Sequence, residues 1–137
     1  MASTDIRLSE KDHAVLDELN GSMGVPLSAY DLVKRLSGAG IRYPVTVYRS
    51  LDKLIAGGLA HRIESSNAFV ACSGCHANDQ PLFALCRTCG SATEVQMRNA
   101  AKLFEAAASK LGFHITDMNL ELKGVCAACA ASNEQDR

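Results

Sequence analysis

Residues 44–72 read PVTVYRSLDKLIAGGLAHRIESSNAFVAC, a helical pattern followed by two short extended segments. Pro44 suits the first turn of a helix, apolar residues then recur at helical spacing, and the glycine pair at 57–58 ends the pattern. The extended segments 59–64 and 68–72 are joined by Ser-Ser-Asn, which is typical of a tight turn. The stretch therefore predicts a helix followed by a β-hairpin.

Two more helical patterns precede this stretch. Ser9 is placed as the N-cap of a helix that runs to Asn20, and Ser28 as the N-cap of a helix over residues 29–37. Three helices followed by a two-stranded hairpin are typical of a winged helix-turn-helix, in which the third helix enters the DNA major groove and the hairpin lies along the backbone. We expect this module to occupy residues 1–73.

The outer face of the third helix carries polar side chains. At about 100° per residue, Thr46, Arg49 and Lys53 lie opposite the apolar stripe. The net charge of the chain is −1, but residues 34–62 contain six basic residues and one acidic residue, so positive charge is concentrated here. An ordinary solvated helix face is the alternative. The residues that we expect to contact DNA are Tyr30, Thr46, Tyr48, Arg49, Lys53, Arg42 and Arg62, the last three at phosphates.

The second half of the chain contains two Cys-x-x-Cys pairs, Cys86 with Cys89 and Cys126 with Cys129, separated by 36 residues. Two thiolates three residues apart can share one edge of a tetrahedron, and a second pair closes the other edge, so the pattern is typical of a structural zinc site. Redox-active thiols are the alternative, but a thioredoxin-like motif occurs once and beside a βαβ pattern. We expect residues 82–137 to form a small module that contains this zinc.

The order of elements in this second module can also be predicted. A strand-strand-helix-strand piece of about 50 residues has little core of its own, which favours dimerisation through its sheet or its helix. The expected segments are strands over residues 82–85, 92–97 and 113–122, a helix over residues 98–111, and a mobile polar tail over residues 130–137.

Residues 74–81 are small, polar and interrupted by glycine and proline, so they read as a hinge between the modules. Cys72, Cys75 and His76 offer metal-binding side chains there. The same residues fit the Cys-x-x-Cys-His pattern of haem attachment, but attachment needs export, and no apolar signal segment begins the chain. We therefore expect the six cysteines to lie in a reducing cytoplasm. No run approaches the roughly 18 apolar residues of a membrane span.

One set of motifs extends over nearly the whole chain. It comprises the run Thr46–Leu51, the pair Gly112-Phe113, the first cysteine pair with the following Gly90, and the run Leu120–Cys129. These motifs resemble the ferric uptake regulator family of bacterial metal-sensing repressors. Within that family, the two runs most similar to the zinc uptake regulator branch are residues 28–32 and 64–72.

The resemblance implies an α+β protein, with an N-terminal winged helix-turn-helix followed by a small α/β dimerisation domain that holds a structural four-cysteine zinc site. It implies a homodimer that binds an AT-rich inverted repeat in operator DNA and controls zinc homeostasis genes. It also implies a second zinc per subunit, an exchangeable regulatory ion at the hinge that orients the DNA-binding domains. The residues implied as its ligands are His61, Cys72, His76 and Glu94, with Cys75 as a competitor of His76.

Several alternatives remain at this level. His61 alternates with Leu59 and Ile63, so taken alone it reads as a partly buried, hydrogen-bonded histidine. The same family includes sensors of other metals, such as iron, manganese or nickel, and of peroxide. One thiolate, two imidazoles and one carboxylate favour tetrahedral zinc. A zinc or thiol redox enzyme is more distant, because a catalytic zinc needs an open position and a nearby base. We therefore expect a regulator, not an enzyme.

Overall fold

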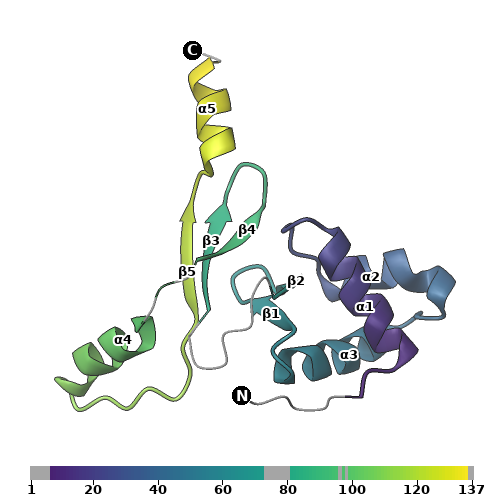
Figure 1. Cartoon of the computed structure of the whole chain (residues 1–137), viewed down its shortest axis with the longest axis horizontal. Coiled ribbons are helices and arrows are strands. Elements are labelled where there is room, and N and C mark those ends of the chain that lie inside the picture. Colours follow the sequence, from purple (N-terminus) through teal and green to yellow (C-terminus); the bar gives the residue numbers. More distant parts are fainter. Residues whose placement is uncertain (1–6, 73–80, 96, 98, 136–137) are drawn as a thin grey trace.

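The computed structural model describes residues 7–72, 81–95, 97 and 99–135. Within these residues, three helices and a hairpin form a winged-helix module (residues 7–72), and a three-stranded sheet with two helices forms a sheet module (residues 81–135) (Figure 1). The elements in chain order are α1 (Glu10–Gly21), α2 (Ala29–Leu36), the short 3-10 helix η1 (Ser37–Ala39), α3 (Pro44–Ala56), β1 (Ala60–Ile63), β2 (Ala68–Ala71), β3 (Leu82–Cys86), β4 (Ala92–Val95), α4 (Ala100–Ser109), β5 (Leu120–Gly124) and α5 (Ala127–Gln135).

Capping boxes begin the first two helices. The Ser9 hydroxyl accepts from the backbone N–H of Asp12, and the Asp12 carboxylate accepts from the backbone N–H of Ser9 at 2.9 Å. Ser28 and Asp31 repeat this exchange at α2. Each box satisfies donors that the first turn of a helix leaves open. Pro44 occupies the first turn of α3, as its sequence position predicts, and the predicted starts of all three helices are confirmed.

The core of the winged-helix module is aliphatic. Its largest fully buried side chains are Val15, Leu19, Leu32, Ile41, Val47, Leu51 and Leu54. Burying each such side chain contributes about 1.5–3 kcal/mol, and truncation of Leu51 to alanine should cost about 2–5 kcal/mol. Since the apolar side of α3 is used in this core, its opposite face stays at the surface.

The predicted hairpin is confirmed as β1 and β2, which pair in antiparallel fashion with His61 opposite Val70. Asn67 adopts φ 48° in the turn, and Arg62 donates to its side-chain oxygen from Nε at 3.1 Å and from Nη2 at 2.8 Å. The buried Phe69 exchanges backbone hydrogen bonds of 2.8 and 3.0 Å with Leu27. The hairpin is therefore attached to the helices as a wing.

The second sheet has the order β4-β3-β5. β3 pairs with β4 in antiparallel fashion and with β5 in parallel, and α4 lies in the crossover that a parallel pair requires. Ile63 and Val70 of the hairpin pack against Phe83 and Ala92 of this sheet, so a small apolar cluster joins the two modules. In Figure 1, α4 and α5 lie at opposite ends of β5.

Two expectations for the sheet module are wrong in detail. The strand expected over residues 113–122 begins only at Leu120 and runs to Gly124, because its partner β3 begins at Leu82, directly opposite Leu120. The tail expected to be mobile from residue 130 instead belongs to α5 as far as Gln135. Alanine has the highest helix propensity, and the backbone N–H of Ala130 donates to the carbonyl of Cys126 at 2.9 Å, which starts this helix at the second cysteine pair.

The sheet module leaves much apolar surface uncovered. The predicted helix is confirmed as α4, but its apolar side chains face outward in this chain. Large apolar residues are exposed on α4 and β5, and also on the segments that follow these two elements. They are Leu103, Phe104, Leu111, Phe113, Leu122 and Val125. Among the described residues, no helix combines the length and the apolar character that crossing a membrane requires.

Candidate metal centres and DNA-binding surface

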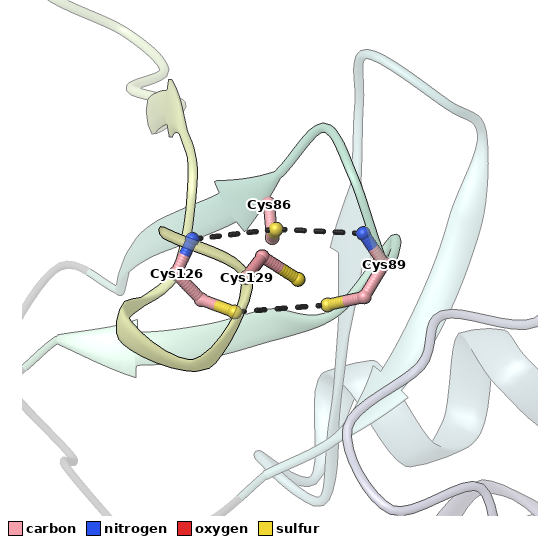
Figure 2. A group of neighbouring side chains, drawn as sticks. All are labelled: Cys86, Cys89, Cys126 and Cys129. Atoms are coloured by element: carbon pink, nitrogen blue, oxygen red, sulfur yellow. Dashed lines mark hydrogen bonds between the residues drawn. The ribbon is translucent and has the colours of Figure 1, made fainter. Parts of the chain in front are cut away.

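Four cysteine side chains converge where β3 and β5 end (Figure 2). Cys86 is the last residue of β3, and Cys126 follows β5 after one intervening residue. The parallel register places Cys86 opposite Gly124, so both Cys-x-x-Cys turns begin at the same edge of the sheet. All four Sγ atoms lie within 4.8 Å of one another. The structure therefore brings together the four residues that the sequence singled out.

The dimensions of this cluster fit a tetrahedral zinc ion. A Zn–S bond of about 2.3 Å separates tetrahedral sulfurs by roughly 3.8 Å. The Sγ atoms of Cys89 and Cys126 are 3.9 Å apart. The Sγ atom of Cys86 also accepts the backbone N–H groups of Cys89 at 3.5 Å and Cys126 at 3.3 Å, and such donors stabilise negative charge on the sulfur.

The protonation of these thiols is uneven. The backbone N–H groups of Cys89 and Cys126 lower the pKa of Cys86 to about 6. The side chain and backbone of Ser91 lower the pKa of Cys89, whereas the neighbouring thiol of Cys126 raises the pKa of Cys129 to about 12. Crowded thiolates repel one another, and a divalent cation removes that repulsion because the thiolate is the metal ligand. The donor set therefore has the chemistry of a metal centre.

A second cluster lies at the junction of the two modules. His61 comes from β1 and Cys72 follows β2, whereas Glu94 comes from β4, and their ligand atoms lie within 4.8 Å of one another. Nε2 of His61 is 3.9 Å from Oε2 of Glu94, and the two side chains are 19% and 6% exposed. A carboxylate this deeply buried needs a partner or a metal. His76 and Cys75, the other candidates for this site, lie outside the described residues.

The donor types at the junction are informative about the metal. One imidazole nitrogen, one sulfur and one carboxylate oxygen are accepted by zinc, whereas iron(II), manganese and magnesium sites are built mainly from oxygen and nitrogen. The ring of His61 is 5.5 Å from the ring of Phe83, so the cluster sits beside the apolar contact between the modules. The three described residues therefore suit a zinc ion that touches both modules.

The DNA-contact candidates are spread over α2, α3, the loop before α3 and the hairpin. Tyr30 is 67% exposed at the start of α2. Thr46 is half-buried, and so is Tyr48, whose ring makes an edge contact with Phe69 at a centroid distance of 6.3 Å. The remaining candidates, all basic and all exposed, are Arg42, Arg49, Lys53 and Arg62. Their role at DNA stays a prediction.

One tertiary contact of α3 was not predicted from the sequence: the contact with Asp12 of α1, which is also part of the capping box with Ser9. The Asp12 carboxylate also accepts from the Ser50 hydroxyl at 2.6 Å and from Nζ of Lys53 at 3.0 Å. Burial alone would raise the pKa of Asp12, but hydrogen bonds from Ser50, Ser9 and Lys53 outweigh it and lower the pKa to about 2. Asp12 therefore attaches α3 to the start of α1. The one signal in the sequence was Ser50 itself, a polar residue at helical spacing among Val47, Leu51 and Leu54.

The whole-chain comparisons agree with this geometry. The chain belongs to the ferric uptake regulator family, whose model matches residues 3–123. Within the family, it is 35% identical over 133 residues to the zinc uptake regulation protein of Escherichia coli (strain K12), a match that covers 93% of this chain and 75% of that protein. It is also 29% identical over 136 residues to the peroxide operon regulator of Bacillus subtilis (strain 168), covering 95% of this chain and 88% of that protein.

Solved structures match both modules together. The crystal structure of holo XcZur aligns with a TM-score of 0.79 at 40% identity, covering 91% of this chain and 87% of that one. A zinc uptake regulator complexed with zinc and DNA aligns with a TM-score of 0.87 at 30% identity, covering 97% of this chain and 89% of that one. The zinc uptake regulator branch suggested by the motifs is therefore supported by sequence and by structure.

Proposed function

We propose that this protein is a zinc-dependent transcriptional repressor, which binds operator DNA as a homodimer in the cytoplasm and controls genes of zinc uptake and homeostasis. The observation that carries the proposal is the cluster of His61, Cys72 and Glu94, because its donors come from both modules. Similarity to the Escherichia coli zinc uptake regulation protein, and to a zinc uptake regulator complexed with zinc and DNA, supports zinc and DNA as the ligands.

Each subunit would hold two zinc ions. The structural ion would be held by Cys86, Cys89, Cys126 and Cys129, and the regulatory ion by His61, Cys72, His76 and Glu94. Zinc bound at the second site supplies a coordination link between the hairpin and β4. His61 and Cys72 belong to the winged-helix module and Glu94 to the sheet module, so bringing these donors together holds the two modules in one orientation.

In the DNA complex, α3 would enter the major groove, with Thr46, Tyr48 and Arg49 near base edges. The other candidates, Tyr30, Arg42, Lys53 and Arg62, would lie closer to the backbone, the three basic ones at phosphates. A two-fold symmetric dimer presents two such helices to successive half-sites, which fits an inverted repeat in AT-rich DNA. The orientation set at the module junction therefore decides whether both helices can bind at once.

The uncovered apolar side chains of the sheet module support the homodimer. Leu103, Phe104 and Phe113 are 58%, 47% and 63% exposed, which is unusual for large apolar residues on a single isolated chain. A second copy of the chain would cover them through α4 and the segment after it. In the proposed dimer, the two sheet modules therefore pair with each other, and each carries one winged-helix module.

The proposal is tested by DNA binding on samples of known metal content. Fluorescence anisotropy with an operator duplex should show tight binding by protein with two zinc ions per chain. Binding should be at least tenfold weaker after mild chelation has removed one of them. The His61→Ala variant should behave as the chelated protein, whereas His13→Ala, which alters an exposed histidine of α1, should respond as wild type. Equal affinity for operator DNA in both metal states would contradict the proposal.

The same samples separate the alternatives. Restoring binding with zinc but not with manganese, iron(II) or nickel at equal free concentration is the expected result, given the thiolate of Cys72 in the donor set. A peroxide sensor would instead lose DNA binding on peroxide exposure, with a modified residue at the junction in mass spectrometry.

Reciprocity also predicts that operator DNA tightens the binding of the regulatory zinc by the same factor by which zinc tightens DNA binding.

A further inference from the structure

A second polar contact joins the modules away from the metal cluster. The backbone N–H of Ser65, in the hairpin turn, donates to Oε1 of Glu121 on β5 at 3.2 Å, across 56 positions of sequence. Burial alone would raise the pKa of Glu121, but hydrogen bonds from Ser65 and from the backbone of Glu64 outweigh it and lower the pKa. The Glu121 carboxylate is therefore charged at neutral pH and bound to the tip of the wing.

The position of this contact differs from that of the metal cluster. His61 and Cys72 lie toward the open end of the hairpin, where it meets α3 and the hinge, whereas Ser65 lies in its closed turn. Ser65 follows His61 by four positions, so an extended chain would separate the two by at most about 13 Å. The strands of the hairpin are held by the backbone of Leu27 and by the packing of Ile63 and Val70, whereas the turn at Ser65 is bound by Glu121. A second attachment at the turn fixes the direction in which the hairpin points.

The other direct contacts of the junction hold other parts of the winged-helix module. The backbone N–H of Ala92 on β4 donates to the carbonyl of Gly24, in the loop after α1, at 2.8 Å. The apolar cluster of Ile63, Val70, Phe83 and Ala92 lies between the two polar contacts. A cavity of about 460 Å³ is lined by Tyr48 of α3, by His61 of the hairpin and by Glu121 of the sheet module. Solvent space therefore lies between α3 and the sheet module here, and Glu121, which binds the hairpin turn at Ser65, is one of the residues beside it.

We propose that Glu121 is a positioning residue, whose carboxylate holds the hairpin turn at Ser65 and so sets, without any metal, how much of the protein already has the DNA-binding orientation. The inference rests on the proposed function and deepens it. When only a fraction of a protein has the binding-competent orientation, the apparent affinity for its ligand falls by that fraction. Glu121 therefore lowers the zinc concentration that is needed for DNA binding.

Three full-length variants test the inference. Glu121→Ala removes the acceptor, and Glu121→Gln keeps one side-chain oxygen that can accept from Ser65. Asp17→Ala removes an exposed carboxylate of α1, away from the proposed dimer and DNA surfaces, as the charge-matched control. Each is titrated with zinc in the presence of labelled operator DNA. The loss of one such hydrogen bond should raise the zinc midpoint of Glu121→Ala by about three- to tenfold. Glu121→Gln should recover most of this loss, and Asp17→Ala should match wild type.

A readout that needs neither zinc nor DNA accompanies the titration. In proton–nitrogen NMR spectra of protein that retains only the structural metal, the Ser65 amide proton should lose its downfield shift and exchange faster in Glu121→Ala. Unfolding curves for the three variants show whether a change arises from general loss of stability. An unchanged zinc midpoint in a folded Glu121→Ala variant would overturn the inference, as would an unchanged Ser65 amide.

Failure of the proposed function gives a different pattern. If wild-type protein binds operator DNA equally with and without the regulatory zinc, the zinc-dependent function is wrong whatever Glu121 does. The inference is then decided on the chelated proteins alone. Weaker DNA binding by Glu121→Ala than by Asp17→Ala would support the role of Glu121 in orientation, and equal binding would overturn it.

Discussion

Nζ of Lys53 lies 3.0 Å from Oδ2 of Asp12, a residue 41 positions earlier in the chain. The same carboxylate caps α1 through Ser9 and accepts from Ser50 of α3. One side chain thus determines where α1 begins and how α3 lies against it. Lys53 is predicted to contact a phosphate of the DNA. Its side chain is half exposed and forms an ion pair with Asp12, so any contact with DNA begins from this ion-paired position.

Replacement of Asp12 by alanine should destabilise the protein by about 2–4 kcal/mol, because it removes a capping box and leaves the buried Ser50 hydroxyl without its acceptor. The measurement is the midpoint of urea unfolding at neutral pH. Asp31→Ala is the matched control, since Asp31 has the same capping role at α2 but is exposed, and it should cost about 1 kcal/mol. Equal losses in the two variants would show that the contacts to α3 contribute nothing.

Asp12 also predicts the direction of a pH effect. Its folded pKa of about 2 is below the ordinary value of 3.8, so the charged form is favoured by folding. The corresponding stability, about 2 kcal/mol, is fully present above pH 4 and is lost as the pH falls through about 2. Acid unfolding of wild type and Asp12→Asn should therefore differ most above pH 4 and converge near pH 2. A gap that stayed constant over this range would contradict the assignment.

The two cysteine-containing clusters should respond differently to mutation. Cys126→Ser should release the structural zinc and unfold the sheet module, because β3, β5 and α5 all end or begin at that cluster. Cys72→Ser should lower the metal content by one ion at most, keep the structural zinc and weaken zinc-dependent DNA binding. Elemental analysis of the purified variants, with circular dichroism, checks both outcomes. Loss of the structural zinc in Cys72→Ser would show that the two sites are not independent.

Arg49 offers the sharpest test of the DNA surface. It is exposed on α3, so Arg49→Ala should weaken operator binding by about tenfold or more and reduce discrimination between operator and unrelated DNA. Arg35→Ala is the control, because Arg35 is an arginine of α2 whose guanidinium lies 3.7 Å from Glu18. Anisotropy titrations with both duplexes at two salt concentrations distinguish a base contact from a phosphate contact. Similar losses on both duplexes would assign Arg49 to the backbone.

The proposed dimer surface is tested by introducing charge. Phe104→Asp should convert a dimer into a monomer in analytical ultracentrifugation, since burying an unpaired carboxylate at an apolar interface costs several kcal/mol. Met23→Asp, at an apolar side chain of the winged-helix module that is 90% exposed, should leave the sedimentation coefficient unchanged. A dimer that persisted in Phe104→Asp would move the interface away from α4.

Local features of this chain follow from short stretches of its sequence. Ser9 and Ser28 each precede an acidic residue by three positions, and this spacing by itself marks the start of a helix. Pro44 and the Gly57-Gly58 pair bracket α3 in the same way, and the spacing of the cysteine pairs predicts a four-thiolate cluster. One error fell where a distant partner decides the outcome, at residues 113–119, which form no strand because β3 begins only at Leu82. The other, at the tail, missed a local helix over residues 127–135.

The sequence by itself therefore determined the starts of the first three helices, the hairpin and the cysteine pairs, because capping, turn chemistry and metal-ligand spacing act over a few neighbouring residues. The candidate ligands at the hinge were implied only by the family resemblance. Only the tertiary structure decided that Glu94 of β4 meets His61 of β1, that Asp12 reaches Lys53, and that Glu121 binds the hairpin turn at Ser65. Each of these contacts joins residues more than 30 positions apart. Such pairs are brought together by sheet register and helix packing, which no short stretch of sequence encodes.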